Sequence, residues 1–163
     1  MVHDRIICLS DNDGDILVSR SLYETQKDQL AEARVAKRVA AKWDCRPIKL
    51  RPLYVIDYAM LRDGKCHAFV EIKCRSYSMR QMDDMGGFML SLDKWRAGID
   101  LSRCSGAAFI LVVSTPDAVW WHRIDAGKPD DHDGVAFGGR TDRDDPQDVE
   151  PVVLLKAARF KKL

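Results

Sequence analysis

The tripeptide Glu71-Ile72-Lys73 constrains the fold of this chain more than any other feature, because it closes the apolar run His67-Ala68-Phe69-Val70. A run of that composition predicts a largely buried strand, where charged side chains need a specific reason to be present. Alternate residues of a strand point the same way, so we expect Glu71 and Lys73 on one face, about 6–7 Å apart, and Ile72 in the opposite layer. The strand therefore presents an acid and a base side by side.

A second run, Leu53 to Met60, places Asp57 in equally apolar surroundings, and the turn signal Arg62-Asp63-Gly64-Lys65 predicts a hairpin between the two runs. Asp57 is then expected to face Glu71. Two carboxylates in a half-buried place repel each other, and the usual compensation is a bound cation. Oxygen ligands favour magnesium or manganese, with Lys73 beside the ion to hold a phosphate oxygen or orient the attacking water. The set indicates metal-assisted hydrolysis of a phosphodiester.

Two helices are predicted on either side of this hairpin. The stretch from Glu24 to Trp43 contains no Gly or Pro and has apolar residues at helical spacing, with Ser21 as a candidate cap and Glu32 on or beside the apolar stripe. The stretch from Ser91 to Cys104 has the same periodicity, with Ser91 as N-cap, Gly106 just past the end and Lys94 in the first turn.

Further strands complete the expected order of elements. Ala107 to Val113 is a continuous apolar run, which predicts a strand covered on both faces of a sheet. Ala118 to Ile124 predicts another strand after a turn at Thr115-Pro116-Asp117, and a short strand is expected around Ile48. The order helix, three strands, helix, two strands predicts an α/β domain with a central mixed sheet flanked by helices.

Asp57, thirteen intervening residues and Glu71-x-Lys73 together resemble the signature of the PD-(D/E)xK nuclease superfamily. The residue before the acid is Ile56, where the family name has proline. The predicted order of elements from about Ser21 to Ile124 is similar to the core of that superfamily. The resemblance implies a restriction-endonuclease-like core and divalent-metal-dependent hydrolysis of DNA phosphodiester bonds.

The resemblance also implies a metal site. Asp57, Glu71 and the backbone carbonyl of Ile72 would ligate Mg²⁺ or Mn²⁺, and Glu32 on the first helix would hold a coordinated water. Lys73 would help orient or deprotonate the nucleophile and stabilise charge on the phosphate.

Related nucleases often carry a Gln or Lys on the helix after the Glu-x-Lys strand, and Lys94 resembles that residue. Plainer interpretations stay open. Glu32 could reach solvent or pair with Arg34 or Lys37, Lys94 could be a surface lysine, and Glu71 with Lys73 could form an ion-pair ladder on a solvent-facing sheet. The main rival function is a nuclease-fold protein without activity that binds nucleic acid or a protein partner.

Composition sets the outer limits. At 163 residues and 46% hydrophobic, without a linker-like stretch, the chain is expected to form a single domain. We expect a nuclease-like core over about 21–124, an exposed acidic loop over 125–150 and a C-terminal edge element over 151–163.

Partners and location follow from charge and cysteine content. Net charge is +1, but basic residues crowd the region from Arg34 to Arg51, which favours contact with a DNA backbone; a homodimer is left open. No apolar segment of membrane-spanning length and no leader are visible, so no membrane partner is expected. Five widely spaced cysteines resemble buried thiols of a reducing compartment, which predicts a cytoplasmic location.

Overall fold

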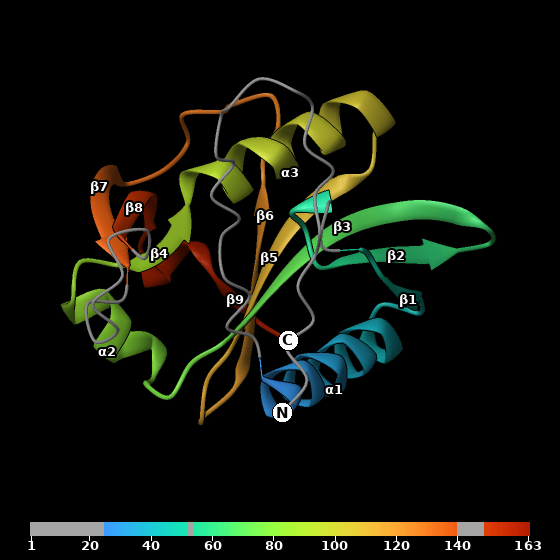
Figure 1. Cartoon of the computed structure of the whole chain (residues 1–163), viewed down its shortest axis with the longest axis horizontal. Helices are drawn as coiled ribbons and strands as arrows, with labels where there is room; N and C mark the ends of the chain where they lie inside the picture. Colours follow the sequence, from blue (N-terminus) through green and yellow to red (C-terminus); the bar gives the residue numbers. More distant parts are fainter. Residues whose placement is uncertain (1–24, 52–53, 140–148) are drawn as a thin grey trace, which may run out of the picture.

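A six-stranded mixed sheet lies at the centre of the computed structural model, which describes residues 25–51, 54–139 and 149–163. Helix α1 (Gln26–Lys42) covers one face of the sheet, and α3 (Leu92–Ser105) lies on the other (Figure 1). The predicted α/β fold with a central mixed sheet flanked by helices is confirmed. The strands, in their order across the sheet, are β1 (Arg46–Lys49), β2 (Tyr58–Arg62), β3 (Lys65–Cys74), β5 (Ala108–Ser114), β6 (Val119–Ile124) and β9 (Lys161–Lys162).

Helix α1 begins at a capping box. The Thr25 side chain accepts a hydrogen bond from the backbone N–H of Asp28, and the Asp28 carboxylate accepts one from the backbone N–H of Thr25. These reciprocal bonds satisfy two of the donors that a helix start leaves open. The predicted helix is therefore confirmed with Thr25 as its cap, and the expected cap Ser21 lies outside the described residues.

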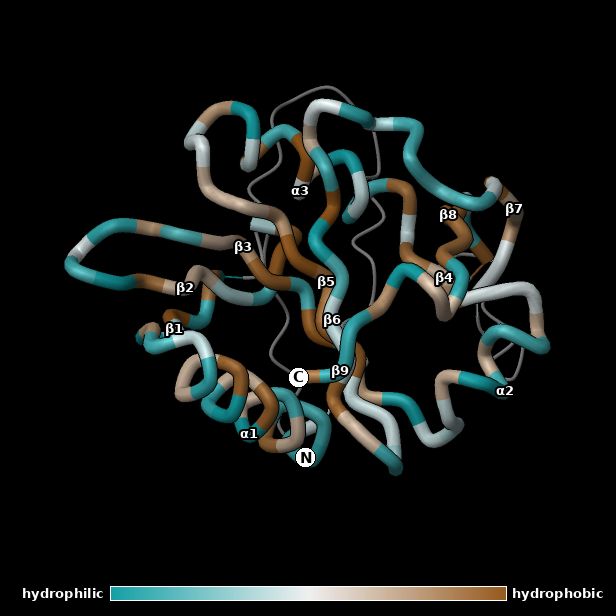
Figure 2. The backbone as a smooth tube through the Cα atoms, turned by 180° about the vertical axis from the view of Figure 1, so that it is seen from behind, coloured by the Kyte–Doolittle hydropathy of each residue, from teal (hydrophilic) through white to brown (hydrophobic). Residues whose placement is uncertain are grey.

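The β2–β3 hairpin turns at Asp63-Gly64, where both residues have positive φ, 50° and 74°. This is the pattern of a tight two-residue hairpin turn, which glycine accepts without strain. Figure 1 shows the end of the hairpin projecting beyond the rest of the sheet, and Figure 2 shows that this end is hydrophilic. The predicted hairpin is confirmed.

The prediction of a strand over Leu53–Met60 is wrong for the first half of that range. Of its described residues, the part before Tyr58 forms a turn, in which Val55 has a φ of 62°. A β-branched residue at positive φ ends extended structure. Asp57 therefore lies just before β2 rather than inside it, and Leu53 itself lies outside the described residues.

Strand β3 pairs antiparallel with β2 and parallel with β5, and β5 pairs antiparallel with β6. The middle of β5 is buried throughout, as expected for a strand covered on both faces. The connection from β3 to β5 runs through α2 (Met79–Asp84), β4 (Phe88–Ser91) and α3. Neither α2 nor β4 was expected from the sequence, because elements of six and four residues carry little periodicity.

A second sheet corrects the prediction for the last forty or so residues. Strands β4, β8 (Val149–Leu155) and β7 (Gly134–Gly139) form a three-stranded antiparallel sheet in the order β4-β8-β7. The segment 125–150 is therefore not wholly an exposed loop, and β8 in the segment 151–163 is a central strand rather than an edge. Strand β7 was not predicted because glycine is uncommon in strands. At Gly138 a glycine suits the packing, since an added Cβ would overlap the Met89 side chain of β4.

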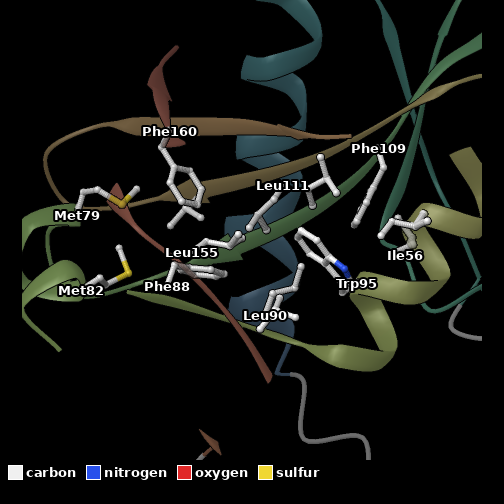
Figure 3. Packing of buried hydrophobic residues seen from close by; sticks show 14 residues of the cluster. Ile56, Met79, Met82, Phe88, Leu90, Trp95, Phe109, Leu111, Leu155 and Phe160 are labelled. Atoms are coloured by element: carbon white, nitrogen blue, oxygen red, sulfur yellow. The ribbon is translucent and has the colours of Figure 1, made fainter. Parts of the chain in front are cut away.

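Two hydrophobic clusters hold these layers together. On one face, Val39 of α1 packs with Val70 and Ile72 of β3. On the other face, Trp95 of α3, Phe109 of β5 and Ile56 pack in one cluster with side chains of the second sheet (Figure 3). Helix α3 approaches β5 closely at Gly98, where an added Cβ would overlap the ring of Phe109. The position of α3 over the sheet is therefore fixed by tight packing.

The cysteines are not the buried thiols that were expected. Cys66, Cys74 and Cys104 are exposed, Cys45 is half-buried, and all four are free; Cys8 lies outside the described residues. In exposed strands and helix ends, apolar neighbours in sequence do not imply burial. None of the helices in the described part of the chain is long and apolar enough to cross a membrane.

Candidate active site

Asp57 is positioned by its neighbour in sequence and by β3. Ile56 is only 2% exposed and lies in the cluster with Trp95 and Phe109, so it anchors the chain immediately before the acid. The Asp57 Oδ2 atom accepts a hydrogen bond of 2.8 Å from the backbone N–H of Ile72. Because the N–H and C=O of a strand residue point to the same side, the carbonyl of Ile72 also points toward the end of β2 where Asp57 lies.

Glu71 is fully buried, at 0% exposure, in a strand paired on both sides. Its Oε1 atom lies 2.5 Å from the Nζ atoms of both Lys73 and Lys94. The second oxygen, Oε2, is buried and accepts no hydrogen bond from the described residues. Burial raises the pKa of the Glu71 carboxyl, and the two lysines partly oppose that rise.

Lys94 lies between the two acids. Its Nζ atom is 2.5 Å from Glu71 Oε1 and 3.7 Å from Asp57 Oδ1. The distance between these two carboxylate oxygens therefore cannot exceed the sum of the two contacts, so both acids lie around the same ammonium group. The interpretation of Lys94 as a surface lysine is wrong, because its side chain is 25% exposed and contacts both acids. The solvent-facing ion-pair ladder is also wrong, since Glu71 is buried.

Lys73 shares the face of Glu71, as expected from strand alternation, and contacts it at 2.5 Å. Burial disfavours the charged form of Lys73, but attraction to Glu71 and Asp57 outweighs burial, so the pKa of Lys73 is raised. At neutral pH this side chain is therefore an ammonium.

Lys49 is a site residue that sequence reasoning missed. Its Nζ atom forms an ion pair with Glu32 of α1 and lies 3.8 Å from Asp57 Oδ1 and 4.8 Å from the centre of the Tyr58 ring. Glu32 is buried at 7% exposure and forms an ion pair with Lys49 of β1, so it does not extend into solvent as one interpretation expected. The register between β1 and β2 would have indicated Lys49, because Lys49 pairs with Tyr58, the residue after Asp57.

Together these six side chains form a chain of alternating charge past the start of β2. It runs from Glu32 through Lys49, Asp57, Lys94 and Glu71 to Lys73. Its three carboxylates and three ammonium groups balance. In the protein without metal, lysines therefore offset the repulsion between Asp57 and Glu71, for which a bound cation was the expected compensation.

A comparison with protein families identifies the family of the chain. The model of the family described as "Phage putative PDDEXK endonuclease" matches residues 18–163. The chain belongs to this family. The PD-(D/E)xK resemblance predicted from Asp57 and Glu71-x-Lys73 is thereby confirmed, and with it the assignment of the chain to a class of phosphodiester-hydrolysing enzymes.

Other comparisons add less. None of the curated proteins matches the sequence. Among solved structures, a similar chain is that of Archaeoglobus fulgidus Hjc, described as a Holliday junction resolvase from an archaeal hyperthermophile. That match has a TM-score of 0.49 and 12% sequence identity over 82% of this chain and 92% of that chain.

PDDEXK nucleases use divalent metals, and the donors at this site fit such an ion. Two carboxylates and a backbone carbonyl are hard oxygen donors of the kind that Mg²⁺ and Mn²⁺ prefer. The buried Oε2 of Glu71, which accepts no hydrogen bond from the part of the chain described, is an oxygen with ligating capacity to spare. Within that part, no group of three or more His, Cys, Asp or Glu side chains converges on one point, so backbone oxygen and water would have to complete the coordination.

Proposed function

We propose that this PDDEXK-family chain hydrolyses DNA phosphodiester bonds with a Mg²⁺ or Mn²⁺ ion held at the start of β2. One observation carries the proposal: the carboxylates of Asp57 and Glu71 converge on a single cationic group, the ammonium of Lys94. An acid just before β2 and an acid of β3 meet there, although each lies in an apolar stretch of sequence. Such convergence is costly to stability, which favours a catalytic purpose.

In this proposal Asp57, Glu71 and the carbonyl of Ile72 hold the ion. When bound, the ion supplies Lewis acidity toward the phosphate and lowers the pKa of a water molecule. The hydrogen bond from the Ile72 N–H fixes one Asp57 oxygen, so its other oxygen, Oδ1, is the one available to a cation. The water-holding role of Glu32, which the family resemblance implies, stays a prediction. Glu32 also forms an ion pair with Lys49, which lies next to Asp57, so we assign Glu32 a role in positioning Asp57 through Lys49.

Lys73 is proposed to stabilise negative charge on the phosphate and to orient the nucleophile. Its side chain is 26% exposed, so an ammonium anchored at Glu71 still has access to a ligand at the surface. Charge stabilisation of this kind is often a large part of catalysis in phosphoryl transfer. The ammonium form favours orientation and charge stabilisation over deprotonation of the nucleophile by Lys73 itself.

DNA is proposed to approach over α1 and β1. The basic residues of this region are exposed and lie on or next to the two elements that carry Glu32 and Lys49, and they can contact a phosphate backbone without reading sequence. They are Arg34, Lys37, Arg38, Lys42, Arg46 and Arg51.

A cleavage assay tests the proposal. The purified chain is incubated with labelled linear, circular and branched DNA in the presence of Mg²⁺, Mn²⁺ or a chelator. We expect cleavage of at least one substrate with either ion and none with chelator. Cleavage that persists in chelator would remove the metal from the function. DNA binding without cleavage under every condition would instead favour the inactive nuclease-fold protein.

The remaining expectations stay predictions from the sequence. They are a single nuclease domain over the whole chain and a cytoplasmic location, and a homodimer is left open by the sequence. Gel filtration with light scattering determines the oligomeric state on the same protein preparation.

A further inference from the structure

Lys94 occupies the place that a cation shared by Asp57 and Glu71 would take. Its ammonium is 2.5 Å from Glu71 Oε1 and 3.7 Å from Asp57 Oδ1. Lys73 forms its ion pair with Glu71, and Lys49 lies near Asp57 Oδ1 and pairs with Glu32. A divalent ion ligated by both acids has to sit within about 2.1 Å of each of them. An ion that ligates Asp57 Oδ1 and Glu71 Oε1 would need the space between these oxygens that the Lys94 ammonium fills.

The charges of the site favour the same conclusion. Glu32, Asp57 and Glu71 are already balanced by Lys49, Lys73 and Lys94. A divalent ion entering this arrangement adds two positive charges next to three ammonium groups in a partly buried place, where charges are poorly screened. Binding of the ion to the free protein is therefore opposed by the protein's own lysines.

We propose that Lys94 is a displaceable internal counter-ion, which keeps the affinity of the free protein for metal low until a DNA phosphate arrives to receive its ammonium. This inference rests on the proposed function, since it concerns the same metal site. Lys94 is a positioning residue in this account: it couples metal binding to DNA binding by exchanging one anionic partner for another. Linkage requires the coupling to act equally in both directions.

The side chain of Lys94 can make this exchange without movement of its helix. Lys94 lies in the first turn of α3, and its side chain is 25% exposed, so the ammonium has a route to the surface. The next residue, Trp95, is 2% exposed, and Gly98 packs on Phe109, so the backbone of α3 is held. Rotation about the flexible bonds of a lysine is sufficient.

Mn²⁺ binding to DNA-free protein tests the inference without any measurement of activity. The free ion is followed by electron paramagnetic resonance while it is titrated with wild type, Lys94→Met, Lys73→Met or Lys65→Met. Lys65→Met is the matched control, because it removes the same charge at the exposed hairpin turn, about 20 Å along β3 from Glu71.

We expect Lys94→Met to bind Mn²⁺ at least tenfold more tightly than wild type, Lys73→Met to show a smaller gain, and Lys65→Met to match wild type. Thermal melting establishes that each variant is folded. If Lys94→Met does not fold, Lys94→Gln carries the same expectation, because it removes the charge and keeps an N–H donor for Glu71.

Equal or weaker Mn²⁺ affinity in a folded Lys94 variant would overturn the inference. If wild type nevertheless cleaved DNA only with metal, the proposed function would stand and Lys94 would have another purpose. If neither wild type nor any variant bound Mn²⁺ and no DNA were cleaved, the proposed function itself would fail, and the inference with it. An equal gain in Lys65→Met would assign the effect to net charge and also overturn the inference.

Discussion

Two charged clusters in this protein are built from the same kinds of groups but differ in how well their atoms are satisfied. In the cluster around Arg159, its guanidinium donates to Asp133 at 2.6 and 3.2 Å and to Asp131 at 3.0 Å, and the backbone N–H of Lys156 donates to Asp133 at 2.7 Å. In the active-site cluster, Glu71 is completely buried and its Oε2 accepts no hydrogen bond from the described residues.

The pKa directions follow the same contrast. Hydrogen bonds from Arg159 lower the pKa of Asp133, while burial raises the pKa of Glu71. The Arg159 cluster connects the loop after β6 to the segment after β8. This structural role is sufficient to explain its charged residues. In the active-site cluster, a buried oxygen of Glu71 accepts no hydrogen bond from the described residues. A buried polar atom without a partner is typical of a site that binds a ligand or an ion. Four predictions sharpen this comparison.

The largest effect is expected from the metal-holding acids. Asp57→Asn and Glu71→Gln should each lower the rate of DNA cleavage by more than the roughly 10- to 100-fold that is typical for outer-shell partners of a metal. Asp133→Asn, which makes the same chemical change in the Arg159 cluster, should leave the rate unchanged. Initial rates on one labelled DNA substrate measure this, and a loss of activity in Asp133→Asn equal to that in Glu71→Gln would erase the distinction between the clusters.

Removal of Lys73 should separate catalysis from metal binding. Lys73→Met should cleave DNA about 10²- to 10⁴-fold more slowly, because a positioned group that handles charge or protons in the transition state is lost. Its Mn²⁺ affinity should not fall, since a charged lysine does not ligate a cation. Calorimetric titration with Mn²⁺ beside the rate measurement checks both statements, and a variant that lost the ion would place Lys73 among the groups that form the metal site.

The Glu32–Lys49 pair should have an intermediate effect. Glu32→Gln and Lys49→Met should each slow cleavage about 10- to 100-fold, because they hold Asp57 in place from outside the metal site. The double variant should lose little more than either single variant, since the two side chains act as a unit. Fully additive losses in a double-mutant cycle would show that Glu32 and Lys49 act separately.

The smallest effect concerns stability at Asp133. Its carboxyl pKa is lowered in the folded protein, so the folded state binds fewer protons there than the unfolded state. The stabilisation is present above the ordinary carboxyl pKa of about 4 and is lost as pH falls through the lowered value. Asp133→Asn should reduce the free energy of unfolding at pH 7 by less than about 1 kcal/mol. Urea unfolding of both proteins should give a difference that shrinks below about pH 4; a constant difference would exclude the charge of Asp133 as its cause.

Much of the fold was accessible from the sequence where periodicity is long. Helices α1 and α3, the β2–β3 hairpin and β5 were predicted because each has either several turns of apolar spacing, a specific turn signal or a continuous apolar run. The elements α2, β4 and β7 were missed. They are short or rich in glycine, and the pairing of β7 with β8 depends on partners that local sequence does not specify.

For the candidate site, alternation in β3 and the hairpin turn together predicted that Asp57, Glu71 and Lys73 would share one region. The contact of Lys94 with both acids depends on how α3 lies over β5, which is set by packing at Gly98 and Trp95. Lys49 required the register of β1. Because both lysines reach the acids through tertiary packing, the sequence could not predict that the protein itself neutralises the site.

The measurement that tests the central claim most directly is anomalous X-ray diffraction from crystals of the protein in complex with DNA, soaked with Mn²⁺. We expect an anomalous peak between the carboxylates of Asp57 and Glu71, within ligand distance of the Ile72 carbonyl, with the Lys94 ammonium moved away from both acids. A peak at another place, or no peak at the start of β2 in crystals of protein that cleaves DNA with Mn²⁺, would contradict it.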